Sequence, residues 1–284
     1  MATIIDGKTV SASVKQRVAE ECKSLYETTG KRPGLAVIIV GDDPASRVYV
    51  NNKKKACELV GFLSREYALP ENTTQETLSD LIEQLNQDDE INGILCQLPL
   101  PKHLDEKAVI EKIAVEKDVD AFHCANVGKI MIGDFDFLPC TPSGIMEMLD
   151  YYNIPISGKE CVVLGRSNIV GKPMAMLLLH KNGTVTICHS RTQNLKEVCQ
   201  RADILVVAVG KPCFVTADMV KDGAVVIDVG INRKADGKLC GDVDFAQVEP
   251  KASYITPVPG GVGPMTIATL MKNTLTAFKI QNHI

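Results

Sequence analysis

Tryptophan is absent from this 284-residue sequence, and aromatic residues make up 5% of it. So few aromatic side chains argue against a stacking platform for single-stranded nucleic acid. The sequence also has no basic patch, and its net charge is −4, which favours a small-molecule partner over nucleic acid. No apolar stretch is long enough to span a membrane, and no apolar segment with a cleavage signal precedes the first predicted helix. We therefore expect a cytoplasmic protein without a membrane partner.

Cysteines are numerous, but the sequence lacks the C-x-x-C spacing that is typical of metal sites. The ten cysteines lie singly at Cys22, Cys57, Cys96, Cys124, Cys140, Cys161, Cys188, Cys199, Cys213 and Cys240. Most of them lie in apolar runs, where a thiol behaves as a small hydrophobic group in a reducing compartment. His123 and His189 each adjoin a cysteine without further ligands at metal spacing. We interpret the cysteines as core residues and expect no metal.

The most informative stretch of the sequence runs from Cys161 to Pro173. A short apolar run ends at Gly165, a second glycine follows at Gly171, and an apolar run typical of a helix comes next. A strand, a tight turn and a helix in this order can present backbone N–H groups and a helix N-terminus to a pyrophosphate. The spacing is G-x-S-x-x-x-G rather than G-x-G-x-x-G, so this turn alone is equally typical of an ordinary parallel sheet.

The next predicted strand, residues 184–189, indicates which nucleotide would bind. It ends in Ser190-Arg191-Thr192, where a site for NAD would have an acidic residue for the ribose hydroxyls. An arginine with two hydroxyl groups suits a 2′-phosphate instead, and Arg166 can approach from the first turn. Further strand-like runs cover residues 203–209 and 224–229. The pattern predicts a Rossmann-type sheet that binds NADP.

The chain exceeds the usual size of one domain, so we expect two. The hydrophobic pattern of the first part predicts helices over residues 13–29, 74–86 and 104–113, a helix starting after Ser46, and strands over residues 35–40, 64–69 and 93–96. Ser13 and Gln16 have the spacing of a capping box. Residues 125–139 read as an irregular loop at the domain boundary. We expect a helix with Thr141 as its N-cap and Pro142 at its first position, and a final helix from residue 265 to about 279.

Three features of the first part are candidates for chemistry. Tyr49 and Lys53 share one face of a predicted helix, although the same pattern is typical of a solvated lysine run with a tyrosine at its edge. Gln97 follows a buried strand, at the end of a parallel sheet where ligands collect, or it satisfies loop backbone there. Asp118 and Asp120 could hold a substrate amine, or cap and solvate their loop. Near the C-terminus, the proline- and glycine-rich run of residues 256–264 is suited to lining a pocket.

Eight motifs lie in order along nearly the whole chain: Tyr49 with Lys53, Gly93–Pro101, Asp118–Asp120, Pro139–Pro142, Gly165–Ser167 with Val170–Pro173, His189–Thr192, Gly241–Phe245 and Thr256–Thr266. Together they resemble the bifunctional methylenetetrahydrofolate dehydrogenase/cyclohydrolase family, in the bacterial form without a synthetase domain. The resemblance implies oxidation of 5,10-methylenetetrahydrofolate with NADP⁺, and hydrolysis of the product to 10-formyltetrahydrofolate in the same cleft.

The resemblance also implies the fold: two α/β domains with a cleft between them, the second a Rossmann-type parallel sheet that binds NADP. Residues 1–138 with 266–284 would form the folate-binding catalytic domain, and residues 139–265 the NADP-binding domain. Family members are typically homodimers through the nucleotide domain. The implied catalytic residues are Tyr49, Lys53, Gln97 and Asp120; substrate binding involves these with Leu98, Pro259, Gly260 and Gly261; cofactor binding involves Gly165, Arg166, Ser167, Val170, Gly171, Ser190, Arg191, Thr192 and Ile231.

One residue departs from the family pattern. Ala121 follows the second aspartate, where the family usually has glycine. If this position requires a positive φ angle, the alanine strains the loop that directs Asp120. Two other functions remain open at this point. A different NADP-linked dehydrogenase would not hydrolyse methenyltetrahydrofolate, and a nucleotide-sensing or cysteine-redox module would bind nucleotide but not folate.

Overall fold

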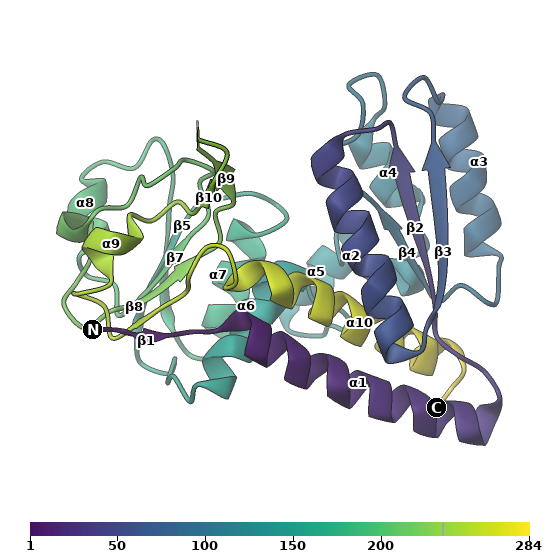
Figure 1. The fold of residues 1–284 in the computed structure, drawn as a ribbon, viewed down its shortest axis with the longest axis horizontal. Coiled ribbons are helices and arrows are strands. Elements are labelled where there is room, and N and C mark those ends of the chain that lie inside the picture. The colour runs from purple at the N-terminus through teal and green to yellow at the C-terminus, as the bar shows by residue number, and fades with distance from the viewer. Residues whose placement is uncertain (235) are drawn as a thin grey trace. The chain divides into compact units, whose positions relative to one another are not determined.

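The computed structural model describes residues 1–234 and 236–284 of the chain (Figure 1). The chain forms two compact units, which we name by their longer segments. The 141–266 unit also contains residues 1–11, and the 12–140 unit also contains residues 267–284. The chain crosses from one unit to the other within the helices α1 (Gly7–Thr29), α6 (Cys140–Tyr151) and α10 (Val262–Gln281).

A parallel sheet with the strand order β3-β2-β4 forms the centre of the 12–140 unit. The elements of this unit, in chain order, are β2 (Gly34–Val40), α2 (Pro44–Val60), β3 (Leu63–Leu69), α3 (Gln75–Asn86), β4 (Gly93–Cys96), α4 (Glu106–Lys112), the short helix η1 (Val115–Lys117) and α5 (Cys124–Ile132). Every residue of β2 is buried, which explains why its sequence is a continuous apolar run. The strands predicted here are confirmed.

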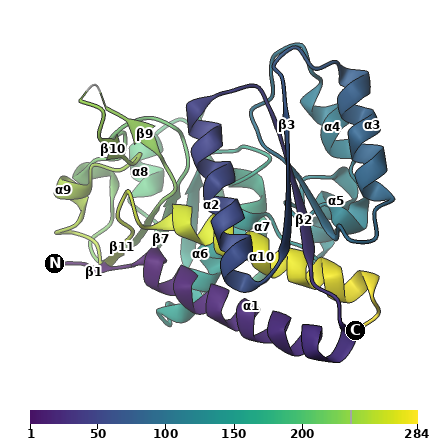
Figure 2. The same cartoon turned by 45° about the vertical axis from the view of Figure 1, so that its right-hand side comes forward.

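Helices cover both faces of this sheet, with α3 and α4 on one side and α2 on the other (Figure 2). The core on the first side consists of side chains from two strands and two helices: Ala36, Ile38, Ile94, Cys96, Leu78, Ile82, Leu85 and Val109. On the opposite side, the thiol of Cys57 on α2 lies 3.8 Å from the sulfur of Met271 on α10. Burying each large apolar side chain contributes roughly 1.5–3 kcal/mol, so this core fixes the strand ends from which loops emerge.

The sheet of the 141–266 unit has the order β1-β11-β8-β7-β5-β6, and each of these pairings is parallel. Its elements are β1 (Thr3–Ile4), β5 (Glu160–Leu164), α7 (Gly171–His180), β6 (Thr184–Cys188), α8 (Leu195–Cys199), β7 (Ile204–Val207), the short helix η2 (Ala217–Met219), β8 (Val225–Asp228), β9 (Asn232–Arg233), β10 (Leu239–Cys240), α9 (Phe245–Val248) and β11 (Tyr254–Ile255). The predicted Rossmann strands correspond to β5, β6, β7 and β8.

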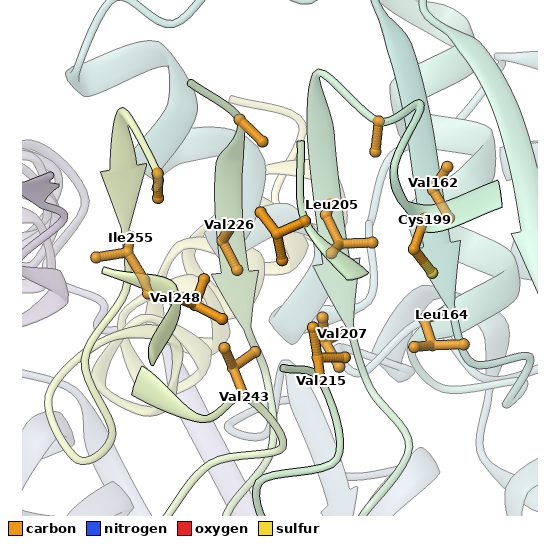
Figure 3. Close-up of a cluster of buried hydrophobic side chains, with 14 of the residues drawn as sticks. Val162, Leu164, Cys199, Leu205, Val207, Val215, Val226, Val243, Val248 and Ile255 are labelled. Atoms are coloured by element: carbon orange, nitrogen blue, oxygen red, sulfur yellow. The ribbon is translucent and has the colours of Figure 1, made fainter. Parts of the chain in front are cut away.

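Figure 3 shows the buried cluster on one face of this sheet. Alternate residues of each strand point to this face, because side chains alternate along a strand. The strands contribute Val162, Leu164, Leu205, Val207, Val226 and Ile255, and the segments packed over them contribute Cys199, Val215, Val243 and Val248. The predicted α/β fold with a Rossmann-type parallel sheet is therefore confirmed.

Helix α1 begins well before the capping box predicted at Ser13 and Gln16, so that prediction is wrong. Asp6 caps the first turn instead. Its carboxylate accepts hydrogen bonds from the backbone N–H of Lys8 at 3.0 Å and from the hydroxyl of Thr9 at 2.6 Å. The first of these bonds satisfies a backbone donor that a helix start would otherwise leave without a partner.

The predicted irregular loop of residues 125–139 is wrong in its first half, where helix α5 lies. The Nδ1 atom of His123 accepts the backbone N–H of Ala125 at 3.1 Å and caps the start of this helix. Gly133 ends it in the left-handed conformation, with φ of 82°. Gly128 lies inside the helix, and a glycine there lowers helix propensity, which explains the error.

Helix α6 starts at Cys140, so the prediction of Thr141 as its N-cap and Pro142 as its first residue is wrong. Both residues lie inside the first turn, where proline is tolerated. The Thr141 hydroxyl instead forms a 2.9 Å hydrogen bond with the hydroxyl of Thr266. Among the helices of residues 1–234 and 236–284, none combines the length and apolar character needed to cross a lipid bilayer.

Candidate functional site

Lys53 projects from helix α2, which its flanking residues fix at both ends. The Asp43 carboxylate accepts the N–H of Ser46 at the start of the helix, and Gly61 ends it with φ of 80°. One helical turn separates Tyr49 from Lys53, so both lie on one face as predicted. Tyr49 is 38% exposed, whereas Lys53 is 8% exposed. The interpretation as a solvated lysine run is therefore wrong for Lys53, whereas Lys54 and Lys55 beside it are exposed.

Gln97 receives the amine of Lys53. The Nζ atom of Lys53 donates to Oε1 of Gln97 at 2.8 Å, and Nε2 of Gln97 donates to the carbonyl oxygen of Leu98 at 2.7 Å. The backbone N–H of Gln97 continues the β4 ladder by donating to Ile38 at 2.8 Å. This amide therefore has a fixed orientation, with its oxygen toward the lysine. Leu98 is partly exposed beside it.

The charges of Lys53 and Asp120 interact within the 12–140 unit. Burial lowers the pKa of Lys53 below its ordinary value, and Asp120 opposes that change. Burial raises the pKa of the Asp120 carboxyl, and the positive charge of Lys53 opposes this change in turn. Burial thus favours the neutral form of each group, and their mutual attraction favours the charged forms. Because the net effect lowers the pKa of Lys53, this amine loses its proton more readily than the amine of an exposed lysine.

The two aspartates of the 118–120 motif differ in their surroundings. The Oδ2 atom of Asp118, which is buried, accepts the N–H of His123 at 2.9 Å and the Nδ2 amide of Asn126 at 2.8 Å. Asp118 therefore holds the loop together, whereas the Asp120 carboxylate interacts with the charge of Lys53. The residue after it, Ala121, has φ of 57°, the positive value anticipated where the family has glycine.

Three thiols near Lys53 were predicted to be core residues, and their proximity to the amine was missed. Cys57, Cys96 and Cys140 are buried, and each interacts electrostatically with Lys53. Burial raises the pKa of Cys57 to about 11 and that of Cys96 to about 12, and it raises the pKa of Cys140 well above its usual range. These thiols are neutral at physiological pH, so they surround the amine without holding it in the charged form. Helical spacing from Lys53 could have identified Cys57.

In the 141–266 unit, the turn after β5 has the close backbone packing of a nucleotide-binding turn. Gly165 has φ of 132°, and a Cβ atom there would lie 2.2 Å from the carbonyl oxygen of Ala208. A Cβ atom at Gly171 would lie 2.3 Å from the carbonyl oxygen of Gly165. The Ser167 hydroxyl oxygen accepts the N–H groups of Val170 and Gly171, at 3.1 and 3.2 Å. Its own hydrogen remains available to a ligand.

The ends of β5 and β6 lie next to each other. These strands pair in parallel, and the N–H of Gly165 donates to the carbonyl of the last β6 residue at 2.9 Å. Arg166 and Arg191 therefore emerge from adjacent strand ends, and both are exposed, as is Ser190. The Thr192 hydroxyl oxygen accepts the N–H of His189 at 2.9 Å, so Thr192 shapes the turn itself.

The other predicted ligand-binding residues also lie in the 141–266 unit. Ile231 follows β8 and is 47% exposed. Pro259 is exposed, and Gly260 has φ of 108°. A Cβ atom at Gly7 would lie 1.8 Å from the carbonyl oxygen of Gly261, so the start of α1 packs directly on this loop. The predicted residues Tyr49, Lys53, Gln97, Leu98 and Asp120 belong to the 12–140 unit instead.

One cluster has the ligand types of a metal site. Glu111, His123 and Cys124 have ligand atoms within 4.8 Å of one another, and Glu111 is the member that sequence spacing did not reveal. The Nδ1 atom of His123 already accepts the N–H of Ala125, so its Nε2 atom bears the hydrogen and faces the Glu111 carboxylate at 3.3 Å. The Cys124 thiol also donates to this carboxylate, at 3.0 Å. We describe the three groups as a cap of α5 and assign no metal to them.

Comparison with known proteins identifies two family models in the chain. The catalytic domain of tetrahydrofolate dehydrogenase/cyclohydrolase matches residues 5–120, and the NAD(P)-binding domain of tetrahydrofolate dehydrogenase/cyclohydrolase matches residues 139–282. A curated relative, the bifunctional protein FolD of Acetivibrio thermocellus, is 64% identical over 99% of this chain and 98% of its own length.

Solved structures give the same result. The bifunctional enzyme FolD from Campylobacter jejuni is 49% identical, with full coverage of both chains and a TM-score of 0.97. The Trypanosoma brucei methylenetetrahydrofolate dehydrogenase-cyclohydrolase, solved with NADP cofactor and an inhibitor, is 41% identical. The alignment covers 100% of this chain and 99% of that one, with a TM-score of 0.96.

Proposed function

The chain belongs to the tetrahydrofolate dehydrogenase/cyclohydrolase family, and on this premise we propose which of its residues carry out the two reactions. The protein is a bifunctional enzyme. It oxidises 5,10-methylenetetrahydrofolate to 5,10-methenyltetrahydrofolate with NADP⁺, and hydrolyses this product to 10-formyltetrahydrofolate. We propose that residues 139–265 form the NADP-binding domain and that residues 1–138 with 266–284 form the folate-binding catalytic domain, to which a few residues of the 256–264 loop add substrate contacts.

The residues after β5 and β6 fit NADP. The glycine turn brings backbone close to where a pyrophosphate would lie, and Ser167 has a hydroxyl hydrogen to donate. Arg166 and Arg191 supply two guanidinium groups for a 2′-phosphate, and no acidic residue follows β6 to repel it. When bound, NADP⁺ accepts the hydride. We propose that Gly165, Val170, Gly171, Ser190, Thr192 and Ile231 complete this site.

The first reaction chiefly requires alignment. The hydride leaves a carbon between two nitrogen atoms, which stabilise the resulting cation, so no strong base is needed. We propose that Tyr49 packs against the folate and that the Asp120 carboxylate binds the amino group and ring N–H of the pterin. A carboxylate can accept both hydrogen bonds at once, which fixes the orientation of the ring. Leu98, Pro259, Gly260 and Gly261 are proposed to contribute the remaining substrate contacts.

The second reaction requires proton transfer. A water molecule loses a proton as it attacks the carbon between the nitrogens, and a ring nitrogen must gain a proton to leave. We propose that Lys53 accepts the first proton and supplies the second. Burial lowers the pKa of this lysine, which increases the share of neutral amine. The amide of Gln97 orients the amine without adding a negative charge that would keep it protonated.

The observation that carries this assignment is the buried Lys53 amine, held 2.8 Å from the Gln97 oxygen beside the Asp120 carboxylate. The test follows the absorbance of methenyltetrahydrofolate after the enzyme is mixed with methylenetetrahydrofolate and NADP⁺. We expect this absorbance to rise and then fall as the two reactions proceed. Methenyltetrahydrofolate added without nucleotide should also be hydrolysed, and a dehydrogenase of another kind would leave it unchanged.

We further propose that the enzyme is a homodimer that assembles through its nucleotide-binding part. In the described residues, β6 lies at one edge of the sheet, and Ile187 on this strand and Leu179 on α7 are both exposed. An edge strand with apolar side chains is favourable for pairing with a second copy. Light scattering should give twice the mass of one chain, and the mass of one chain would contradict the proposal. We also propose a cytoplasmic location, because a reducing compartment suits the buried thiols.

A further inference from the structure

The carboxylate of Asp242 is fully buried and accepts hydrogen bonds from two separate loops. Its Oδ2 atom accepts the backbone N–H groups of Val209 and Gly210, at 2.7 and 2.9 Å. Its Oδ1 atom accepts the N–H of Lys211 and the Nδ2 amide of Asn232, each at 2.8 Å. Four donors converge on one side chain with an exposed fraction of 0%. No step of the two reactions uses this group.

The two loops follow neighbouring strands. Residues 208–211 come directly after β7, and residues 229–232 come directly after β8. These strands pair in parallel, so both loops lie at the same edge of the sheet as the turn after β5. Ligands of open parallel sheets bind at this edge. The 208–211 loop also touches the turn itself, because a Cβ atom at Gly165 would lie 2.2 Å from the Ala208 oxygen.

Two glycines make room for the buried carboxylates. A Cβ atom at Gly230 would lie 2.4 Å from Oδ1 of Asp242, and a Cβ atom at Gly241 would lie 1.8 Å from Oδ2 of Asp228. Asp228 in turn accepts the N–H groups of Asp242 and Gly230, at 2.9 Å each. The segments around residues 230 and 241 therefore interlock, and neither tolerates a side chain at its glycine.

The backbone that carries Asp242 is itself anchored in the core. The carbonyl of Asp242 accepts the N–H of Val215 at 2.9 Å, and Val215 and Val243 form a parallel bridge. Both valines belong to the buried cluster of this unit (Figure 3). Because its backbone is bonded to the core, the carboxylate has a fixed position, and the hydrogen bonds to it fix the positions of the two loops.

We propose that Asp242 is a positioning residue for nucleotide binding: it fixes the loops after β7 and β8 in the geometry that receives NADP. The proposal rests on the proposed nucleotide site of this unit. It assigns to Asp242 the task of holding two loops by four hydrogen bonds, not of contacting the ligand. An amide at this position would turn a donor toward N–H groups, so Asp242→Asn should release at least one of the two loops.

The experiment compares the parent with Asp242→Asn, Asn232→Ala and the control Asp244→Asn. Asp244 lies in the same motif but caps α9, a task that asparagine also performs. Calorimetry gives the affinity for NADP⁺, and hydrolysis of methenyltetrahydrofolate without nucleotide reports on the folate site. Amide hydrogen exchange at residues 209–211 reports directly on the loop.

We expect Asp242→Asn to weaken NADP⁺ binding by roughly tenfold or more and to speed exchange at residues 209–211, with hydrolysis near the parental rate. Asn232→Ala removes one donor and should weaken binding by a few-fold, roughly. It decides the question if Asp242→Asn does not fold. Unchanged NADP⁺ affinity in the variants, or an equal loss of nucleotide binding and hydrolysis, would overturn the proposal. A parent that does not bind NADP⁺ would instead overturn the proposed function.

Discussion

The amine of Lys53 and the amide oxygen of Gln97 meet at 2.8 Å, although 44 residues separate them in the sequence. One group comes from the middle of α2 and the other from the end of β4. The lysine brings a proton that can be exchanged, and the glutamine brings a neutral acceptor that sets its direction. Because the amide itself is bound to the Leu98 carbonyl, it cannot rotate to present its NH₂ group without losing that bond.

Replacing Lys53 with methionine should abolish hydrolysis of methenyltetrahydrofolate while folate affinity stays near the parental value. Methionine keeps an apolar stem of similar length and removes the amine that transfers protons. Loss of a positioned acid or base typically costs a factor of roughly 10² to 10⁴ in rate. Stopped-flow measurement of hydrolysis, with Lys54→Met as an exposed control on the same helix, tests this. Hydrolysis at the parental rate would show that Lys53 does not have the proposed role.

The pH dependence of hydrolysis should change when Gln97 is replaced with glutamate. The neutral amine is the active base, and burial lowers the pKa of Lys53 below 10.5, so the parental rate should rise with pH through a midpoint below this value. A carboxylate in place of the amide favours the charged lysine and raises its pKa, which moves the rising limb to higher pH. At a fixed pH below the midpoint, each unit by which the pKa of Lys53 rises lowers the fraction of neutral amine about tenfold. A profile that does not move would contradict the coupling.

Asp120→Asn should weaken folate binding without affecting NADP⁺. The substitution keeps the shape of the side chain and removes the charge proposed to bind the pterin. Hydrogen bonds to charged groups contribute about 1.5–3 kcal/mol, so folate affinity should fall by roughly one to two decades. Titration of both ligands tests this, with Glu116→Gln as an exposed control in the same segment. Equal weakening of both ligands would indicate that the loop has lost its fold.

The same glycine-to-alanine change should have opposite effects at two positions. At Gly171 the new Cβ atom would lie 2.3 Å from the Gly165 oxygen, and overpacking of this kind costs about 1–3 kcal/mol. At Gly128, inside α5, nothing lies within 4 Å, and alanine should stabilise the helix by about 0.5–1 kcal/mol. Thermal unfolding should show a lower midpoint for Gly171→Ala and a higher midpoint for Gly128→Ala than for the parent. Nucleotide binding should weaken in Gly171→Ala alone.

The central strands of both sheets could be predicted because they are buried on two faces and therefore apolar throughout, as in β2. The strands β1 and β11 could not, since each has two residues and no periodicity. Helix α5 was missed because its cap is a histidine and its middle a glycine. Local patterns report local structure, and these elements depend on contacts with distant parts of the chain.

The candidate site divides in the same way. Helical spacing predicted that Tyr49 and Lys53 share one face of a helix, and the position of Gln97 at the end of a strand indicated that it could contact a ligand. The environment of Lys53 could not be inferred, because Asp120 and Cys140, with which its amine interacts, are distant from it in the sequence. A contact of Asn273 with the loop of Asp120 could not be inferred either. The Nδ2 atom of Asn273 donates to the carbonyl of Val119 at 2.8 Å, although the two lie 154 residues apart in the sequence.

The cofactor preference should depend on Arg191. The exposed guanidinium groups of Arg191 and Arg166 emerge from adjacent strand ends, where a 2′-phosphate with nearly two negative charges would need partners. Arg191→Ala should reduce kcat/KM with NADP⁺ by about one to two decades and change it little with NAD⁺, which lacks the phosphate. The expected result is thus a changed ratio between the nucleotides. Arg201→Ala, an exposed control in the same unit, should leave that ratio unchanged.

The two arginines can be separated by a double-mutant cycle. If Arg166 and Arg191 bind one phosphate, removing one arginine changes the contribution of the other to nucleotide binding. The effects of the two substitutions should then not add. Additive losses would place the arginines on different parts of the nucleotide. A parent that already prefers NAD⁺, or an unchanged preference in Arg191→Ala, would contradict the assignment altogether. Measuring kcat/KM for both nucleotides in the parent, the two single variants and the double variant distinguishes these results, because each predicts a different pattern of the four ratios.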